Sequence, residues 1–344
     1  MSTANESAEK VRAIRAGAGL FRRSDLGLLE VAGGDRRRWL QGMLSNDVEA
    51  LEPAPGRSGC AAALLNHRAG VIAALQVLCR PEVFWLEGER SALEAARTRM
   101  QAFIVADDVE VRDPSPEIAV LGLEGPEAGA WLAAAFGVEA PGRDAVASAA
   151  FGPGEVMIGG WGSAAAVGFR LYCERTAVDA VVEALQGAAA PEALIEGDAG
   201  AREILRIEAG LPAHGSELGE DRLPDEARLE HTISETKGCY TGQEIIARLR
   251  SRGRVNHLLV GLRFAEGEMP DLGSALYAAP SAAASAAKPG DRGKRIGEVT
   301  SLCVSPDFAA IGLGFVRRKC ADPGTQVATA RGVARVAELP FSLG

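Results

Sequence analysis

The stretch LGLLEVAGGDRRRWLQGML, Leu26 to Leu44, contains the first two elements of an α+β unit. Its first seven residues are apolar apart from Glu30 and predict a strand. Gly33-Gly34-Asp35 then predicts a turn. The following apolar side chains recur at helical spacing, so we expect a helix capped at its N-terminus by Asp35.

The elements on either side of this stretch extend the pattern to a complete unit. Apolar runs at 60–65, 71–78 and 83–86 predict strands, and they are followed by an amphipathic helix near 91–103 and a strand near 109. The order β-α-β-β-(β)-α-β is typical of a ferredoxin-like unit. Because the same order recurs after Pro116, we predict two such units, at about 26–113 and 117–195.

The last third of the chain has a different pattern of apolar and polar residues. A helix-like run at 201–209 and a charged loop belong to a closing segment, 196–254, which completes an N-terminal region of residues 1–254. Beyond Arg254 the chain turns into short β-like pieces, which predict a C-terminal β-barrel at 255–344. These pieces lie at 257–264, 297–304, 309–316 and 325–330, and the low-complexity stretch 278–295 predicts a hairpin loop between two of them.

Composition excludes several classes of protein. The chain has 344 residues and a formal net charge of −9, which disfavours a whole-surface grip on nucleic acid, so direct tRNA binding is not expected. The six cysteines lack a CxxC pair and the four histidines lack HxH or HExxH spacing, so no metal site is predicted. Without a signal-peptide pattern or an apolar run of ~18 residues, we expect a cytoplasmic monomer with no membrane segment.

The segment KGCYTGQE, Lys237 to Glu244, is the strongest candidate for a functional site. Thr241 and Glu244 have the spacing of a capping box, so a helix is expected to begin at Thr241. Cys239 would then lie just before the helix N-terminus, where the dipole and Lys237 favour a thiolate. The alternative is a capped helix whose cysteine is an inert small hydrophobe, and the spacing alone favours that alternative.

A carboxylate and a basic strip are two further candidates. Glu208, at the end of a largely apolar helix, is able to accept two parallel N–H bonds from a planar ring edge such as that of a pterin. A surface ion pair with Arg202 or Arg206 is the alternative that spacing favours. The arginines at 248, 250, 252 and 254 would hold a polyglutamate tail, bind RNA, or complement the helix C-terminus.

Taken together, these residues resemble the YgfZ proteins, which share the fold of the aminomethyltransferase (T-protein) of the glycine cleavage system. The pattern KGCYTGQE-x-x-x-A-R at 237–248 carries the resemblance. It is supported by GGDRRRWLQGMLSNDV at 33–48, Leu65-Asn66 with Gly70, LRIEAGLP at 205–212 and the ending at 339–343. The resemblance implies an α+β fold in which two ferredoxin-like domains form a ring around a central channel, followed by a C-terminal β-barrel.

The resemblance also implies a function. YgfZ proteins bind tetrahydrofolate in the channel and support iron–sulfur cluster assembly or repair, including in tRNA-modifying enzymes. The partners would be folate and iron–sulfur enzymes or assembly factors. Cys239 would be the functional thiol and Glu208 the residue that holds the pterin. The other expected folate contacts are Asn66, Lys237, Tyr240, Gln243 and Arg248.

The sequence departs from the T-protein pattern at one catalytic position. T-proteins carry an aspartate shortly after an Asn-x-x-Gly-Gly turn, where this chain reads Gly70-Val71-Ile72-Ala73-Ala74. Alanine neither takes a proton nor stabilises a developing positive charge, which argues against aminomethyl transfer. Two alternatives stay open beside the YgfZ-like role: a glycine-cleavage aminomethyltransferase and a non-catalytic interaction protein.

Overall fold

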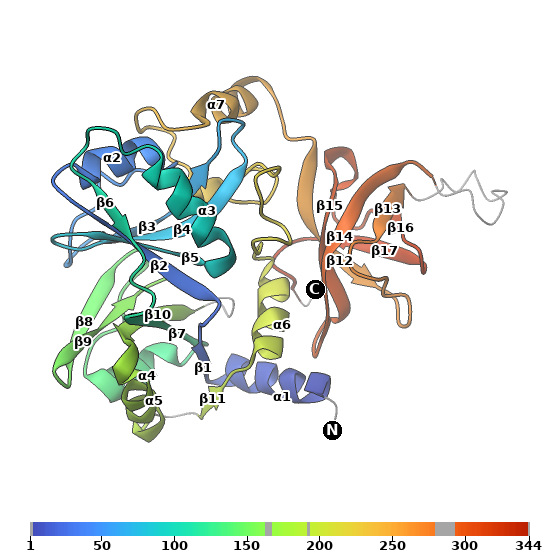
Figure 1. The fold of residues 1–344 in the computed structure, drawn as a ribbon. Coiled ribbons are helices and arrows are strands. Elements are labelled where there is room, and N and C mark those ends of the chain that lie inside the picture. The colour runs from blue at the N-terminus through green and yellow to red at the C-terminus, as the bar shows by residue number, and fades with distance from the viewer. Residues whose placement is uncertain (1–2, 162–166, 191–192, 279–292, 343–344) are drawn as a thin grey trace.

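A computed structural model describes residues 3–161, 167–190, 193–278 and 293–342, and in it two α+β units and a barrel surround a central helix (Figure 1). In that view the two sheets lie one above the other at the left, the barrel lies at the right, and helix α6 stands between them. The hairpin loop predicted at 278–295 falls mostly on 279–292, outside the described residues.

The first α+β unit is a five-stranded antiparallel sheet in the order β3-β4-β5-β2-β6, with two helices packed against it. Its elements are β2 (Leu26–Ala32), α2 (Arg36–Met43), β3 (Gly59–Leu65), β4 (Val71–Cys79), β5 (Phe84–Glu89), α3 (Arg90–Gln101) and β6 (Glu110–Arg112). Apolar side chains of both helices, such as Trp39 and Leu93, join the core of the sheet. The predicted order of elements is confirmed.

Asp35 precedes α2 but does not cap it. Its carboxylate accepts a hydrogen bond from the backbone N–H of Asp108 at 2.9 Å, and it makes no side-chain bond to an N–H group of the helix. The prediction of an Asp35 cap is therefore wrong, because the carboxylate ties the start of α2 to the segment before β6 instead.

The second unit repeats the arrangement in a six-stranded sheet with the order β11-β1-β7-β10-β9-β8. Its elements are β7 (Ile118–Glu124), α4 (Ala128–Phe136), β8 (Val146–Phe151), β9 (Gly154–Gly159), β10 (Gly168–Glu174), α5 (Val178–Gly187) and β11 (Leu194–Glu196). The sixth strand, β1 (Ala18–Arg22), follows helix α1 (Thr3–Ala16) and pairs with both β7 and β11. Residues that precede the first unit thus complete the sheet of the second, which the sequence did not predict.

The barrel is joined to the two units through helix α6 (Ala199–Ala209), which packs on α1 and on the barrel. Its six strands close in the order β12-β15-β14-β13-β16-β17. They are β12 (His257–Phe264), β13 (Ala275–Ala278), β14 (Arg295–Ser305), β15 (Ala309–Arg317), β16 (Gln326–Ala328) and β17 (Val333–Ala337). The four predicted pieces are strands, whereas β13 and β17 were missed.

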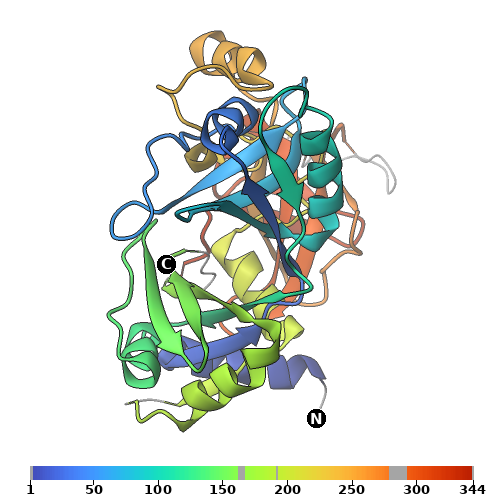
Figure 2. The ribbon, with the colours of Figure 1, turned by 60° about the vertical axis from the view of Figure 1, so that its left-hand side comes forward.

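The two sheets lie one against the other (Figure 2). A cluster of buried aromatic and aliphatic side chains joins them. Trp85 of β5 and Tyr172 of β10 meet edge to face with ring centroids 6.1 Å apart. The Tyr172 hydroxyl is satisfied across the interface, since it donates a hydrogen bond to Glu87 at 2.8 Å and accepts one from Trp161 at 3.0 Å. This contact fixes the relative position of the two sheets and therefore the shape of the space between them and α6.

Candidate functional site

A cavity of about 390 Å³ lies where the two sheets, α6 and the segment near Leu339 meet. Leucines from both sides, among them Leu26, Leu75 and Leu229, give it apolar walls. Its polar and charged lining consists of Arg23, Gln76, Glu87, Glu89, Glu124, Arg170, Arg202, Arg206, Arg228, His231 and Thr232. Apolar walls with a few convergent polar groups are the usual form of a small-molecule site.

Charged side chains reach the cavity because they occupy one face of each strand. Glu87 and Glu89 are two residues apart on β5, so both point to the same side of the sheet. On the other unit, Arg170 of β10 binds Glu124 of β7, with 3.2 Å between Nη1 and Oε1, and its Nε lies 3.7 Å from Glu87. Arg170 therefore holds two of the three cavity carboxylates in ion pairs.

Glu89 is the cavity carboxylate with the most remaining capacity to accept hydrogen bonds. Among the described residues its one hydrogen bond is from the backbone N–H of His214, at 3.0 Å. Burial raises the pKa of Glu89 above its ordinary range. Leu75 of β4 pairs with Gly88 of β5, so Ala74 and Glu89 are the next residues on two antiparallel neighbours, and both line the cavity. Glu89 thus stands across from Ala74, one of the two alanines in the stretch where the resemblance to T-proteins implies an aspartate.

Two further groups leave polar atoms at the cavity wall. The side-chain nitrogen of Gln76 is buried and, within the described part of the chain, has no hydrogen-bond partner. Arg23 and Arg202 share the carboxylate of Asp25, at 2.7 and 3.4 Å. Burial and the nearby Arg23 charge lower the pKa of Arg202. An unpaired buried donor is costly, which makes Gln76 a natural contact for a ligand acceptor.

Glu208 lies outside the lining of this cavity. Its buried carboxylate accepts a hydrogen bond from Ser305 at 2.6 Å and forms an ion pair with Arg15 of α1. Its backbone carbonyl accepts a bond from Phe341 at 2.8 Å. Glu208 therefore joins α6 to α1 and to the barrel, and the surface pairing with Arg202 or Arg206 is not formed.

Lys237 is a buried structural contact. Its ammonium donates hydrogen bonds to the backbone carbonyls of Gln41, Leu44 and Asn46 at 2.6, 2.5 and 2.9 Å, at the C-terminal end of α2. Burial lowers the pKa of Lys237 to about 8. The cation lies 5.3 Å above the ring of Tyr240, which is itself buried in a core cluster. The Lys237 ammonium group, which was expected to favour a Cys239 thiolate, thus donates to three backbone carbonyl groups instead.

Cys239 is exposed, and its loop precedes the helix α7 (Gln243–Arg252). The predicted start at Thr241 is wrong, and no side chain caps α7. The reason is Gly242, which has φ of +85° and packs so closely on the turn after β3 that a Cβ would lie 2.9 Å from the carbonyl oxygen of Asn66. The left-handed glycine turns the chain, and the helix begins after it.

The remaining predicted residues lie on this same side of the molecule. Asn66 shapes the β3–β4 turn, because its side-chain oxygen accepts bonds from the N–H groups of Arg68 and Gly70, both at 2.9 Å. Gln243 is half-buried at the start of α7, and Arg248 is exposed on that helix. The structure therefore brings the 237–243 loop to the Asn66 turn, but none of these residues lines the cavity.

We expect Lys237→Met to lower the free energy of unfolding by about 1–2 kcal/mol. Three carbonyl groups would lose a charged donor, while the relief from burying an ammonium group offsets part of that loss. Urea denaturation measures the change, with Arg248→Met as the control because Arg248 is exposed on α7. If both variants unfold at the same urea concentration, Lys237 does not secure the end of α2.

The cavity residues were missed by the sequence analysis, although the strands carry a signal. Glu87 and Glu89 alternate with apolar residues in FWLEGE, and Arg170 stands in the middle of GFRLYCE. Charges inside otherwise apolar strands mark a polar face that needs partners.

No group of three or more histidine, cysteine, aspartate and glutamate side chains within the described ranges is placed to hold a metal ion. Across the same ranges, no helix has the length and apolarity to cross a membrane.

Comparisons with known proteins agree with this architecture. The family described as the GCVT N-terminal domain matches residues 2–237. An aminomethyltransferase of Rubrobacter xylanophilus is 31% identical over 335 residues, 96% of this chain and 84% of that protein. One of Bacillus licheniformis is 28% identical over 346 residues, 97% of this chain and 89% of that protein. The crystal structure of glycine cleavage system aminomethyltransferase T from Bartonella henselae has a TM-score of 0.83 and 25% identity, covering 98% of this chain and 89% of that one. The predicted fold class is confirmed.

Proposed function

We propose, because the chain belongs to the family of the GCVT N-terminal domain, that it is a tetrahydrofolate-binding protein and that the ligand occupies the central cavity. The observation that carries the proposal is the cavity itself. Its volume of about 390 Å³ is in the range of ligand pockets, and both α+β units and α6 supply its walls.

The residues present fit such a ligand. Leu26, Leu75 and Leu229 offer apolar surface to a flat ring system. Glu89 is able to accept N–H bonds from a ring edge, and the unpartnered Gln76 amide nitrogen is able to donate to a ring carbonyl. When bound, tetrahydrofolate would supply a carrier for one-carbon groups. The folate roles of Cys239, Glu208, Asn66, Lys237, Tyr240, Gln243 and Arg248 stay predictions.

For the biological role we propose YgfZ-type support of iron–sulfur cluster assembly or repair. The KGCYTGQE segment favours it, as does the exposure of Cys239, which leaves the thiol accessible to a partner protein. The alanines at 73 and 74 also favour it, because they stand in the stretch where the resemblance implies a T-protein aspartate, and Ala74 lines the cavity. A cytoplasmic location and iron–sulfur proteins as partners are part of this proposal.

Aminomethyl transfer is the second candidate, and two observations favour it. The relatives at 28–31% identity are named aminomethyltransferases. In addition, Glu89 places a carboxylate directly across from Ala74, so the cavity does not lack a group that takes a proton or stabilises positive charge.

Titration of the full chain with tetrahydrofolate in a calorimeter tests the shared part of both roles. We expect saturable binding at one site, retained in Glu82→Gln because Glu82 is exposed and lies outside the cavity. Absence of binding in the folded wild-type protein would overturn the proposal.

Two assays then separate the roles. Formation of methylenetetrahydrofolate from an aminomethylated lipoyl carrier would establish the second candidate. For the first, iron–sulfur enzyme activity is measured in a deletion strain that expresses wild type or Cys239→Ala. We expect the variant to restore less activity, and full restoration would show that the thiol has no role.

A further inference from the structure

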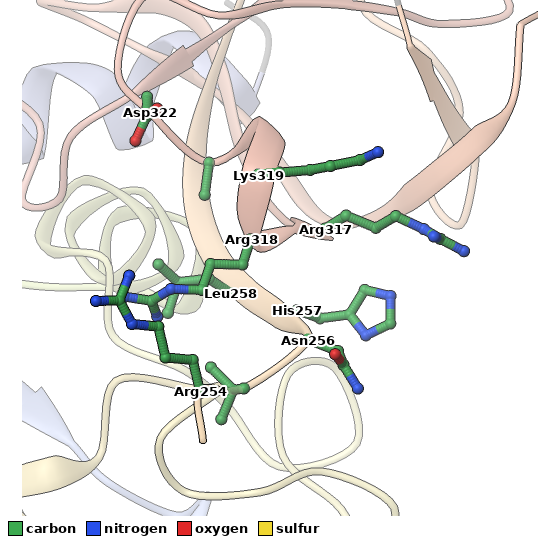
Figure 3. A pocket seen from close by; sticks show the side chains of 10 residues that line it. Arg254, Asn256, His257, Leu258, Arg317, Arg318, Lys319 and Asp322 are labelled. Carbon is green, nitrogen blue, oxygen red and sulfur yellow. The ribbon is translucent and has the colours of Figure 1, made fainter. Parts of the chain in front are cut away.

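A second cleft, of about 930 Å³, lies between the end of α7 and the barrel (Figure 3). One wall is the segment from Arg254 to Leu258, which leads into β12. The other is the end of β15 with the short helix Arg318–Cys320. Both walls are rich in positive charge, although acidic residues outnumber basic ones in the whole chain by 46 to 37.

Among the described residues the four cations of this cleft form no ion pair, although one carboxylate, that of Asp322, also lines the cleft. Arg254, Arg317, Arg318 and Lys319 all line it, and none of them forms an ion pair within the described part of the chain. The neighbouring Arg250 differs, because it is paired with Asp225 at 3.2 Å. Complementing the end of α7 accounts for Arg254 alone, since the other three come from the barrel. Unpaired cations from two segments in one cleft are the usual signature of an anion site.

The cleft is held in shape by main-chain bonds. The N–H of Arg318 donates to the carbonyl of Asn256 at 2.8 Å, and His257 pairs with Arg317 at the end of the β12–β15 ladder. In Figure 3 the side chains of Arg254 and Arg318 extend to one side of the cleft, and those of Arg317 and Lys319 to the other. The charges are therefore spread along the cleft, which suits an extended ligand with several negative groups.

The cleft and the central cavity share no lining residue, but a third hollow borders both. This smaller hollow, of about 300 Å³, shares Arg254 and Arg318 with the cleft and shares Arg228 with the cavity. Arg228 is fixed between them, because its Nε donates to the carbonyl of Leu259 at 2.7 Å. A row of three guanidinium groups, those of Arg228, Arg254 and Arg318, thus lies between the cavity and the basic cleft. The hollow is also lined by Asp225, which is paired with Arg250, and by Glu230.

We propose that this row is the binding site for the oligo-γ-glutamyl tail of a folate whose ring system occupies the central cavity. Such a tail is an extended chain with one carboxylate per glutamate, and guanidinium groups bind carboxylates strongly. The proposal rests on the proposed function, because the tail reaches the cleft only from a ligand in the cavity. It is preferred over the phosphates of RNA because the net charge of −9 opposes a polyanion that approaches from solution.

Calorimetry with the full chain and two ligands, monoglutamyl and pentaglutamyl tetrahydrofolate, tests this proposal. In low salt we expect the pentaglutamyl form to bind wild type about tenfold more tightly, an advantage that shrinks as salt is added. The double variant Arg254→Gln/Arg318→Gln should lose the advantage and keep the monoglutamyl Kd. The control Arg97→Gln/Arg331→Gln removes the same charge at exposed pairs elsewhere and should behave as wild type.

The outcomes separate this proposal from the proposed function. Equal Kd values for the two ligands in wild type would overturn the tail site while leaving folate binding in the cavity intact. Failure of both ligands to bind would overturn the proposed function and the tail site together. If an RNA oligonucleotide binds wild type but not the double variant, while the pentaglutamyl form gains nothing, the cleft binds phosphates and the tail site is wrong.

Discussion

Replacing Arg206 with methionine is expected to lower the free energy of unfolding by about 3–5 kcal/mol. Arg206 is a buried residue of α6, and its guanidinium binds Glu217 at 3.1 Å and donates to Ser301 of the barrel at 2.7 Å. Glu217 is completely buried, so without Arg206 its charge would lie in the interior with no cation beside it. An unpaired buried charge is among the most costly defects in a folded protein.

Urea denaturation of wild type and three variants tests this expectation. Arg97→Met is the matched control, since Arg97 forms an exposed pair with Glu94 one helical turn away and should matter by less than about 0.5 kcal/mol. The double variant Arg206→Met/Glu217→Met removes both charges and is expected to regain much of the lost stability. A single variant as stable as the control would mean that Arg206 does not hold α6 to the barrel.

The LRIEAGLP segment shows what local sequence does not reveal. Spacing along the helix favoured surface pairs for Glu208, but its partners are Arg15 and Ser305, 193 and 97 residues away. Burial depends on which distant elements pack on the helix, and a periodic pattern reports only that one face is apolar. The segment was therefore recognised as important, whereas the partners of Glu208 were not predicted.

The fold was easier to predict from the sequence than the site, because it depends less on contacts between distant residues. Long apolar runs such as Leu26–Ala32 and His257–Phe264 predict strands by themselves, and their order gives the ferredoxin-like units. Short strands such as Ala275–Ala278 and Val333–Ala337 form because the barrel closes around them. The capping box after Tyr240 failed because a distant turn demands a left-handed Gly242, which no local rule includes.

The cavity residues depend entirely on such distant contacts. Glu89, Arg170 and Arg202 come from three elements, and only the packing of both sheets against α6 brings them together. The sequence showed that alanines stand at 73 and 74, in the stretch where T-proteins carry an aspartate. The glutamate opposite Ala74 was not recognised, because only the pairing of β4 with β5 makes the two residues neighbours.

Replacing Glu89 with glutamine is expected to weaken tetrahydrofolate binding by about a hundredfold, because a charged acceptor facing the ligand is lost. Glu87 and Glu124 cannot compensate, since Arg170 is already placed against both. Calorimetric titration at neutral pH measures the change. Glu82→Gln, an exposed change in the same unit, is the control and should leave Kd unaltered.

The pH dependence of binding distinguishes a ligand contact from a structural role. Burial raises the pKa of Glu89, so wild-type affinity should fall as pH decreases through that raised pKa and the carboxylate gains a proton. Glutamine does not titrate, so the variant should lack this component of the profile. Parallel pH profiles for wild type and Glu89→Gln would contradict a direct contact with the ligand.

The Glu89→Gln substitution should lower the affinity for tetrahydrofolate without lowering the free energy of unfolding. Since the folded pKa lies above the unfolded one, the folded state binds more protons between these two values, and the charge lowers stability at higher pH. Glutamine removes that charge and keeps an oxygen that accepts the bond from His214, so the variant should be at least as stable as wild type at neutral pH. A residue whose removal stabilises the fold and abolishes tight binding is retained for the ligand, whereas a loss of stability in the variant would mark Glu89 as structural.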